Sequence, residues 1–159
     1  MKKKYLPLMF KTIVVHSLTY SIVGGLYYQL VTHRYYVGET AVVDWLMRDP
    51  NSLWVQSLWL PAQVLRGILI SIILYAIYDR IVELKNKGWM LISGLYLLVG
   101  WLSAAGPTPG SIEGIVYTKV PLDFQIISAL EVIIQGLLLG LILNKWIQKT
   151  EAIQEVNLL

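Results

Sequence analysis

Two charged residues lie inside otherwise apolar stretches of the sequence, Arg66 and Glu131. Arg66 precedes Asp79, and Glu131 precedes Asn144, by about 13 residues, which is about 20 Å of helix before polar residues return. A charge inside a membrane is costly and usually faces the protein interior with a partner. If the two stretches run in the same direction, these opposite charges lie at the same depth, which predicts an Arg66–Glu131 ion pair.

Further polar side chains extend these two positions into stripes along predicted helices. Ser128 stands three residues before Glu131, and Gln135 stands four residues after it. Gln63 stands three residues before Arg66. The predicted polar seam takes seven side chains from three stretches: His16, Tyr20, Gln63, Arg66, Ser128, Glu131 and Gln135. Such a seam has two interpretations. It is a structural contact that holds helices in register, or it is a mid-membrane site for a solute, ion or proton.

His16 is the one histidine inside an apolar stretch, and we interpret it as a hydrogen-bonded core residue or a proton-handling partner of the seam. The other histidine, His33, is about 25 Å away along the same predicted helix, so the two cannot ligate one haem within a chain. The sequence has no cysteine, which excludes thiol chemistry and thiolate metal sites. We therefore expect no metal and no cofactor.

Gly136 and Gly140 form a G-x-x-x-G pattern in the last apolar stretch. Small residues four apart let two helix backbones approach closely. The two glycines point away from Glu131 at about 100° per residue, so this helix has a polar face and an opposite packing face. The packing face predicts either a contact within the chain or a homodimer.

Four apolar stretches must position these residues. The sequence is 56% hydrophobic and only 14% charged, against about 25% charged residues in soluble domains, and its apolar residues come in runs long enough to cross a bilayer. We predict an all-α, polytopic membrane protein, a four-transmembrane-helix bundle that forms a single domain over 1–159. The predicted spans are 6–31, 61–80, 89–106 and 122–144.

Charge predicts the orientation, because basic residues gather on the cytoplasmic side of short loops. Nine lysines and arginines fall on one side of the predicted bundle: Lys2, Lys3, Lys4, Lys11, Arg80, Lys85, Lys87, Lys145 and Lys149. Both termini are then cytoplasmic in a plasma-membrane protein, and the loops 32–60 and 107–121 are external. The first outer loop is long and mixes apolar and charged residues, which predicts interfacial helices at 42–47 and 53–60, the second bending at Pro61. Asn51 or Ser52 is its expected N-cap.

No phosphate-binding glycine loop, metalloprotease motif or serine-nucleophile motif occurs, so we expect no catalytic residues and a role other than an enzyme. Three function classes follow, in order of preference. The first is a small membrane protein that transports or binds a small solute, ion or proton through the seam. The second is a non-catalytic membrane subunit or assembly factor. The third is a membrane enzyme acting on a lipid or quinone at the outer face. The expected partners are the lipid bilayer and a homodimer or larger membrane complex, and not nucleic acid.

Overall fold

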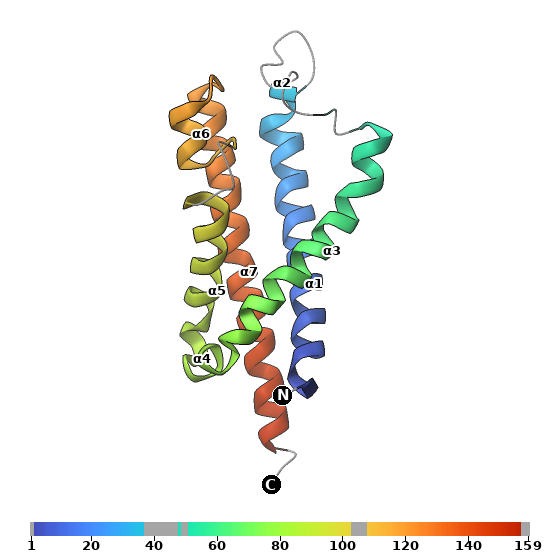
Figure 1. Cartoon of the computed structure of the whole chain (residues 1–159), viewed down its shortest axis with the longest axis vertical. Helices are drawn as coiled ribbons and strands as arrows, with labels where there is room; N and C mark the ends of the chain where they lie inside the picture. The colour runs from blue at the N-terminus through green and yellow to red at the C-terminus, as the bar shows by residue number, and fades with distance from the viewer. Residues whose placement is uncertain (1, 37–47, 49–50, 103–107, 157–159) are drawn as a thin grey trace.

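The computed structural model describes residues 2–36, 48, 51–102 and 108–156, and within these ranges it is helical and has no strand (Figure 1). The helices follow one another as α1 Lys2–Tyr27, the π-helical η1 Tyr28–Thr32, α2 His33–Tyr36, α3 Leu53–Ala76, α4 Tyr78–Glu83, the 3₁₀ turn η2 Lys85–Lys87, α5 Gly88–Leu97, the π-helical η3 Leu98–Leu102, α6 Ile112–Tyr117 and α7 Leu122–Val156. The prediction of an all-α protein is confirmed for these residues.

Three helices among the described residues are long and apolar enough to cross a membrane: Tyr5–Tyr36, Leu53–Ala76 and Leu122–Gln154. They cover three of the four predicted spans. The remaining span, 89–106, is helical over 88–102 as α5 and η3, which is about 22 Å at 1.5 Å per residue and shorter than about 30 Å of hydrocarbon. The four-span count therefore stays a prediction.

The segment 53–60, predicted as a separate interfacial helix, is the first part of one continuous α3. Ser52 is its N-cap and accepts a hydrogen bond from the Val55 N–H at 3.4 Å, as one of the two predicted caps. Pro61 lies inside the helix and removes one backbone hydrogen bond without ending it. In Figure 1, α3 runs obliquely across the bundle and its first turns lie away from the other helices. The other predicted interfacial helix, 42–47, lies outside the described residues.

Close contacts at glycines fix how the helices pair. A Cβ on Gly140 would meet Ser93 Oγ and stand 2.7 Å from the Trp89 carbonyl, and one on Gly136 would stand 2.9 Å from the Tyr96 ring. These two glycines therefore bring α7 directly against α5. On the other side of the bundle, a Cβ on Gly67 would stand 2.8 Å from the Cα of Ile13, which marks the crossing of α1 and α3.

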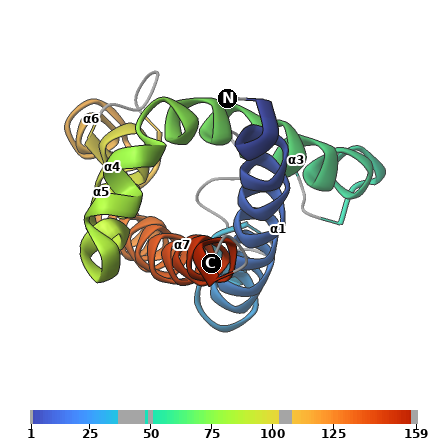
Figure 2. The ribbon, with the colours of Figure 1, turned by 90° about the horizontal axis from the view of Figure 1, so that it is seen from below.

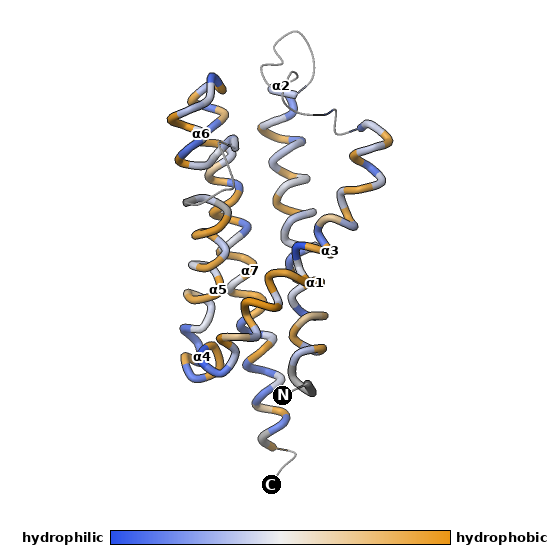
Figure 3. The backbone as a smooth tube through the Cα atoms, viewed as in Figure 1, coloured by the Kyte–Doolittle hydropathy of each residue, from blue (hydrophilic) through white to orange (hydrophobic). Residues whose placement is uncertain are grey.

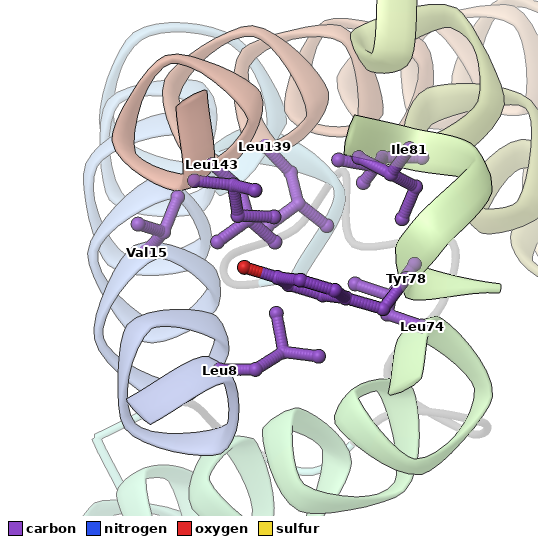
Figure 4. Packing of buried hydrophobic residues seen from close by; sticks show 9 residues of the cluster. Leu8, Val15, Leu74, Tyr78, Ile81, Leu139 and Leu143 are labelled. Atoms are coloured by element: carbon purple, nitrogen blue, oxygen red, sulfur yellow. The ribbon is translucent and has the colours of Figure 1, made fainter. Parts of the chain in front are cut away.

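An apolar cluster fills the half of the bundle that holds α4. Figure 2 shows α1, α3, α5 and α7 arranged around the bundle axis, and Figure 4 shows the side chains that meet between them. Several of them have no exposed surface, including Ile81, Leu139, Leu143 and Ile147. The cluster has nine buried members: Leu8, Val15, Leu74, Tyr78, Ile81, Ile92, Leu139, Leu143 and Ile147. We call this cluster the apolar plug.

The start of α1, the end of α7 and α4 lie at one end of the molecule, and α2, α6 and the start of α3 lie at the other (Figure 1). Hydrophobic residues follow α3, α5 and the middle of α7, and hydrophilic ones gather at α4 (Figure 3). The predicted cytoplasmic cations of α4 and η2, namely Arg80, Lys85 and Lys87, thus share an end with both termini.

The segment 108–118, which belongs to the predicted second outer loop, is an ordered turn held by one glutamine of α7. Gln125 is 1% exposed, and its Oε1 accepts a hydrogen bond from the Gly110 N–H at 2.6 Å. Its Nε2 donates to the Gly114 carbonyl at 2.9 Å and to Thr118 Oγ1 at 2.8 Å. Ser111 caps the short helix α6. We call residues 108–118 the outer cap, where outer names the end of the molecule that holds α2, α6 and the start of α3.

Candidate functional site

The candidate site begins where α1 crosses α3. His16 has no exposed surface, and its Nε2 lies 3.1 Å from Oε1 of Gln63, which is also buried. With the amide in this orientation Nε2 carries the proton and Nδ1 is the bare acceptor. Nδ1 is buried and has no hydrogen-bond partner. The close backbone contact at Gly67 is what brings these two side chains within reach.

Tyr96 of α5 joins this pair to α7. Its ring centroid lies 5.9 Å from that of His16, and its hydroxyl donates to Gln135 Oε1 at 2.9 Å. Gln135 is 4% exposed, and its Nε2 is buried without a partner. His16, Gln63, Tyr96 and Gln135 thus form one group of polar side chains from four helices, which we call the central cluster. Two of its nitrogens have no partner, so it can still bind a polar atom.

Arg66 and Glu131 line different cavities, and they do not form the predicted ion pair in this structure. The Arg66 guanidinium lies 6.0 Å from the centroid of the Tyr20 ring. Within the described ranges, the ion pair within 4.0 Å is Arg80–Glu83, at the surface. The structure therefore brings these residues to the same region without joining their charges.

Glu131 faces the outer half of α1. A Cβ on Gly24 would stand 3.3 Å from its Oε1, so the carboxylate lies where α1 has no side chain. It is partly buried, and no hydrogen bond or ion pair joins it to another described residue. A carboxylate in such a place can accept hydrogen bonds or attract a cation, because all its oxygen lone pairs are available.

A cavity of about 630 Å³ surrounds Glu131 between α1, the first turns of α3 and α7. We call it the Glu131 cavity. Half of its lining residues are aromatic or hydroxyl-bearing, and it extends from Glu131 to Tyr36 of α2 and to the first turn of α3. Its lining consists of Tyr20, Ser21, Gly24, Gly25, Tyr28, Thr32, Tyr36, Arg48, Val55, Gln56, Trp59 and Glu131. Tyr28 and Thr32 belong to the π-helical turn η1, a feature often found at functional sites.

A second cavity of about 430 Å³ lies between α3 and α5, and we call it the Arg66 cavity. Apart from Arg66, Tyr96 and Thr108, its wall is made of leucine, isoleucine and valine. The two cavities therefore differ in chemistry: one holds a carboxylate among aromatic rings, and the other holds a guanidinium among aliphatic side chains.

The remaining predicted residues lie outside the central cluster. Ser128 packs under the outer cap, where a Cβ added to Gly110 would stand 2.8 Å from the Cβ of Ser128. Gly136 and Gly140 contact α5 of the same chain. Of the predicted seam, His16, Gln63 and Gln135 belong to the central cluster, Tyr20 and Glu131 line one cavity, and Arg66 lines the other.

Sequence reasoning missed Tyr96, Gly24 and Tyr28. Tyr96 is the one hydroxyl-bearing aromatic residue between Leu91 and Val99. A single tyrosine in an apolar run could have been predicted as a polar contact inside the bundle. Tyr28 could not be placed by helical spacing, because the π turn changes the phase of the side chains. Gly24 leaves room for the Glu131 carboxylate, and this role depends on the fold, which brings α7 against α1 at that position.

Within the described ranges, no group of three histidine, cysteine or acidic residues could hold a metal ion. Comparison with protein-family models, with curated proteins and with solved structures finds no match to this chain.

Proposed function

We propose that the chain is a plasma-membrane protein with four crossings and both termini in the cytoplasm, in which α5 and η3 form a short third crossing. Two observations support this. Arg80, Lys85 and Lys87 lie at the same end as both termini. The helices α5 and α7 run antiparallel and pack closely at Gly136 and Gly140. A helix packed in this way against α7 lies at the same depth in the membrane as α7 does.

We further propose that the protein binds a small organic cation from the outer side, as the binding step of membrane transport. The observation that carries this is Glu131, an unpaired carboxylate in a cavity that reaches the outer ends of the helices. An unpaired charge at this depth is costly, and a cationic ligand offsets the cost. Within the described residues, neither Arg66 nor Arg48, which also lines this cavity, forms an ion pair with Glu131.

The wall of the Glu131 cavity favours a soft, organic cation over a bare metal ion. Tyr20, Tyr28, Tyr36 and Trp59 line it, and the faces of such rings attract ammonium groups. Its volume, about 630 Å³, is within the range of about 300–1,000 Å³ typical of small-molecule sites. A metal ion would need several oxygen ligands, and Glu131 is the one carboxylate in the wall.

The apolar plug supports a one-sided, outward-facing state. Leu139 and Leu143 are fully buried on α7 beyond Gln135, so on this helix apolar side chains lie between a ligand at Glu131 and the end that holds both termini. Transport then requires a second arrangement of the helices that opens the plug. His16 Nδ1 and Gln135 Nε2, both buried and unpaired, lie between Glu131 and the plug and offer the next polar contacts.

Thermal unfolding in detergent tests the proposal. Methylammonium and tetramethylammonium chloride are titrated against sodium chloride at equal ionic strength, and sodium methanesulfonate serves as the anionic control. We expect a saturable rise in Tm with an ammonium salt, because a ligand that binds the folded state adds about 2.7 kcal/mol of stability at 100 times its Kd. Glu131→Gln is expected to abolish the rise.

Glu113→Gln is the matched control, since Glu113 is an exposed carboxylate on α6 and not in the cavity wall. It is expected to keep the full rise in Tm. If no ammonium salt stabilises the unaltered protein, or if Glu131→Gln responds equally, the cation site is wrong. The non-catalytic subunit then becomes the favoured function.

A further inference from the structure

The Arg66 cavity carries an inference that is separate from the cation site. Its two walls are α3 and α5, and its aliphatic part includes Ile70, Ile73, Leu74 and Ile92. These residues follow Arg66 along α3 toward α4, or face it from α5. The polar part consists of Arg66, Tyr96 and Thr108, and Thr108 belongs to the outer cap. The cavity therefore has a polar end toward the outside and an apolar end toward the plug.

Arg66 is a cation without a counter-charge in this apolar setting. It is exposed on the side of α3 that borders the cavity, and its described contact is the face of the Tyr20 ring at 6.0 Å. No carboxylate of the described chain forms an ion pair with it. A ring face offsets only part of the cost of placing a guanidinium in a bilayer, and arginines in such places bind anions or backbone carbonyls.

We propose that the Arg66 cavity binds a single-chain anionic amphiphile of the membrane, with its carboxylate on Arg66 and its alkyl chain between α3 and α5. A guanidinium binds a carboxylate through two parallel hydrogen bonds, and Tyr96 and Thr108 are the other polar residues of the cavity wall. The aliphatic walls cover the chain. The ligand class is thus a long-chain carboxylate.

Charge and size favour this ligand over phosphate monoesters and over two-chain lipids. One guanidinium balances one negative charge, which a carboxylate carries, whereas a phosphate monoester carries about 1.5 to 2 negative charges. A cavity of about 430 Å³ is at the lower end of the usual range of small-molecule sites, which suits one chain rather than two. A two-chain phospholipid would leave much of its surface outside.

The test compares four probes on the unaltered protein by thermal unfolding in a maltoside detergent at pH 8. Sodium palmitate has both the chain and the charge, hexadecanol has the chain alone, and sodium acetate has the charge alone. Palmitoyl lysophosphatidylglycerol has one chain and a phosphodiester. We expect palmitate to raise Tm in a saturable way. Hexadecanol should act at least about tenfold more weakly because it lacks the charge-assisted pair, and acetate should act more weakly because it lacks the chain. The lysophospholipid, which also has one chain and one negative charge, should act no more strongly than palmitate. Equal effects of palmitate and hexadecanol would overturn the proposal, and so would a stronger effect of the lysophospholipid.

Variants locate the site. Arg66→Gln is expected to raise the apparent Kd for palmitate at least about tenfold, and Arg66→Lys to raise it less, because lysine keeps the charge and loses the paired geometry. Ile73→Trp fills the cavity and is expected to abolish the response. Arg80→Gln, at an exposed arginine near the cytoplasmic end, is the matched control and keeps it. An unchanged palmitate response in Arg66→Gln and Ile73→Trp would show that palmitate binds elsewhere and contradict the assignment.

Discussion

His16 Nε2 lies 3.1 Å from Gln63 Oε1, and this contact joins α1 to α3 at the centre of the bundle. Both residues are buried, so neither can replace its partner with bulk water. The contact uses Nε2 of His16 and leaves Nδ1 buried without a hydrogen-bond partner. The polar interior of this protein therefore rests on a neutral hydrogen bond rather than on the ion pair that the sequence predicted.

Removal of either partner of this hydrogen bond should destabilise the protein. Removal of both should lower the free energy of unfolding by less than the sum of the two single losses. Gln63→Leu leaves a second nitrogen of His16 unpaired. We expect a coupling of about 0.5–1.5 kcal/mol between His16→Leu and Gln63→Leu, as for other interhelical hydrogen bonds in membranes. The measurement is a double-mutant cycle on the free energy of unfolding in detergent. Gln29→Leu, at an exposed position on η1, is the control and should change stability by less than about 0.5 kcal/mol.

Gly140→Ala should separate α5 from α7. The added methyl group would meet Ser93 Oγ and stand 2.7 Å from the Trp89 carbonyl, and a backbone atom cannot move aside as a side chain can. We expect a loss of about 1–3 kcal/mol, as for other overpacked sites. Gly25→Ala has no atom within 4 Å of its new methyl group and should lose nothing. A harmless Gly140→Ala would mean that α5 does not pack there.

Arg66→Leu and Glu131→Leu should have additive effects. The two side chains form no ion pair and line different cavities. Non-contacting residues usually add within about 0.5 kcal/mol, and a cycle on unfolding free energies measures this directly. Strong recovery in the double variant would instead support the ion pair predicted from the sequence.

Gln125→Leu should release the outer cap while leaving the spans folded. The change removes three hydrogen bonds, to Gly110, Gly114 and Thr118, inside a buried site. Each buried group left unpaired costs about 1–3 kcal/mol, so the cap should open more often. Amide hydrogen exchange should rise in 108–118 and stay unchanged at Ile13 and Val15 of α1. Protection equal to that of the unaltered protein would show that other contacts hold the cap.

The sequence predicted the long helices because their apolar runs exceed what a soluble core needs. It did not predict that α7 continues to Val156, since the apolar pattern ends near Asn144. Contacts made by the charged tail explain this extension. Lys11 Nζ donates to Thr150 Oγ1, and the Tyr78 hydroxyl donates to Glu151 Oε1 at 2.8 Å. Long-range contacts of this kind leave no periodic signal.

The polar residues of the site were largely predictable, and their pairing was not. Helical spacing singled out His16, Gln63 and Gln135, because a polar side chain in an apolar run is costly and needs a partner. Which partner it finds depends on helix crossing angles and on close approach at Gly67 and Gly24, and both need the fold. Equal depth suggested that Arg66 meets Glu131, whereas the tilt of α3 directs Arg66 to Tyr20 instead.

The central claim, a carboxylate site open to the outside and closed to the cytoplasm, is tested most directly by thiol labelling, because the chain has no cysteine of its own. Ser21→Cys places a thiol in the wall of the Glu131 cavity, and Leu139→Cys places one in the apolar plug. Membrane-impermeant methanethiosulfonates are added from outside, one with a trimethylammonium group and one with a sulfonate. We predict that Ser21→Cys reacts about tenfold faster with the cationic reagent than with the sulfonate, a difference of about 1.4 kcal/mol. Glu131→Gln should remove this preference. Leu139→Cys should react with neither reagent. Equal rates for the two reagents, or a preference unchanged by Glu131→Gln, would contradict the account.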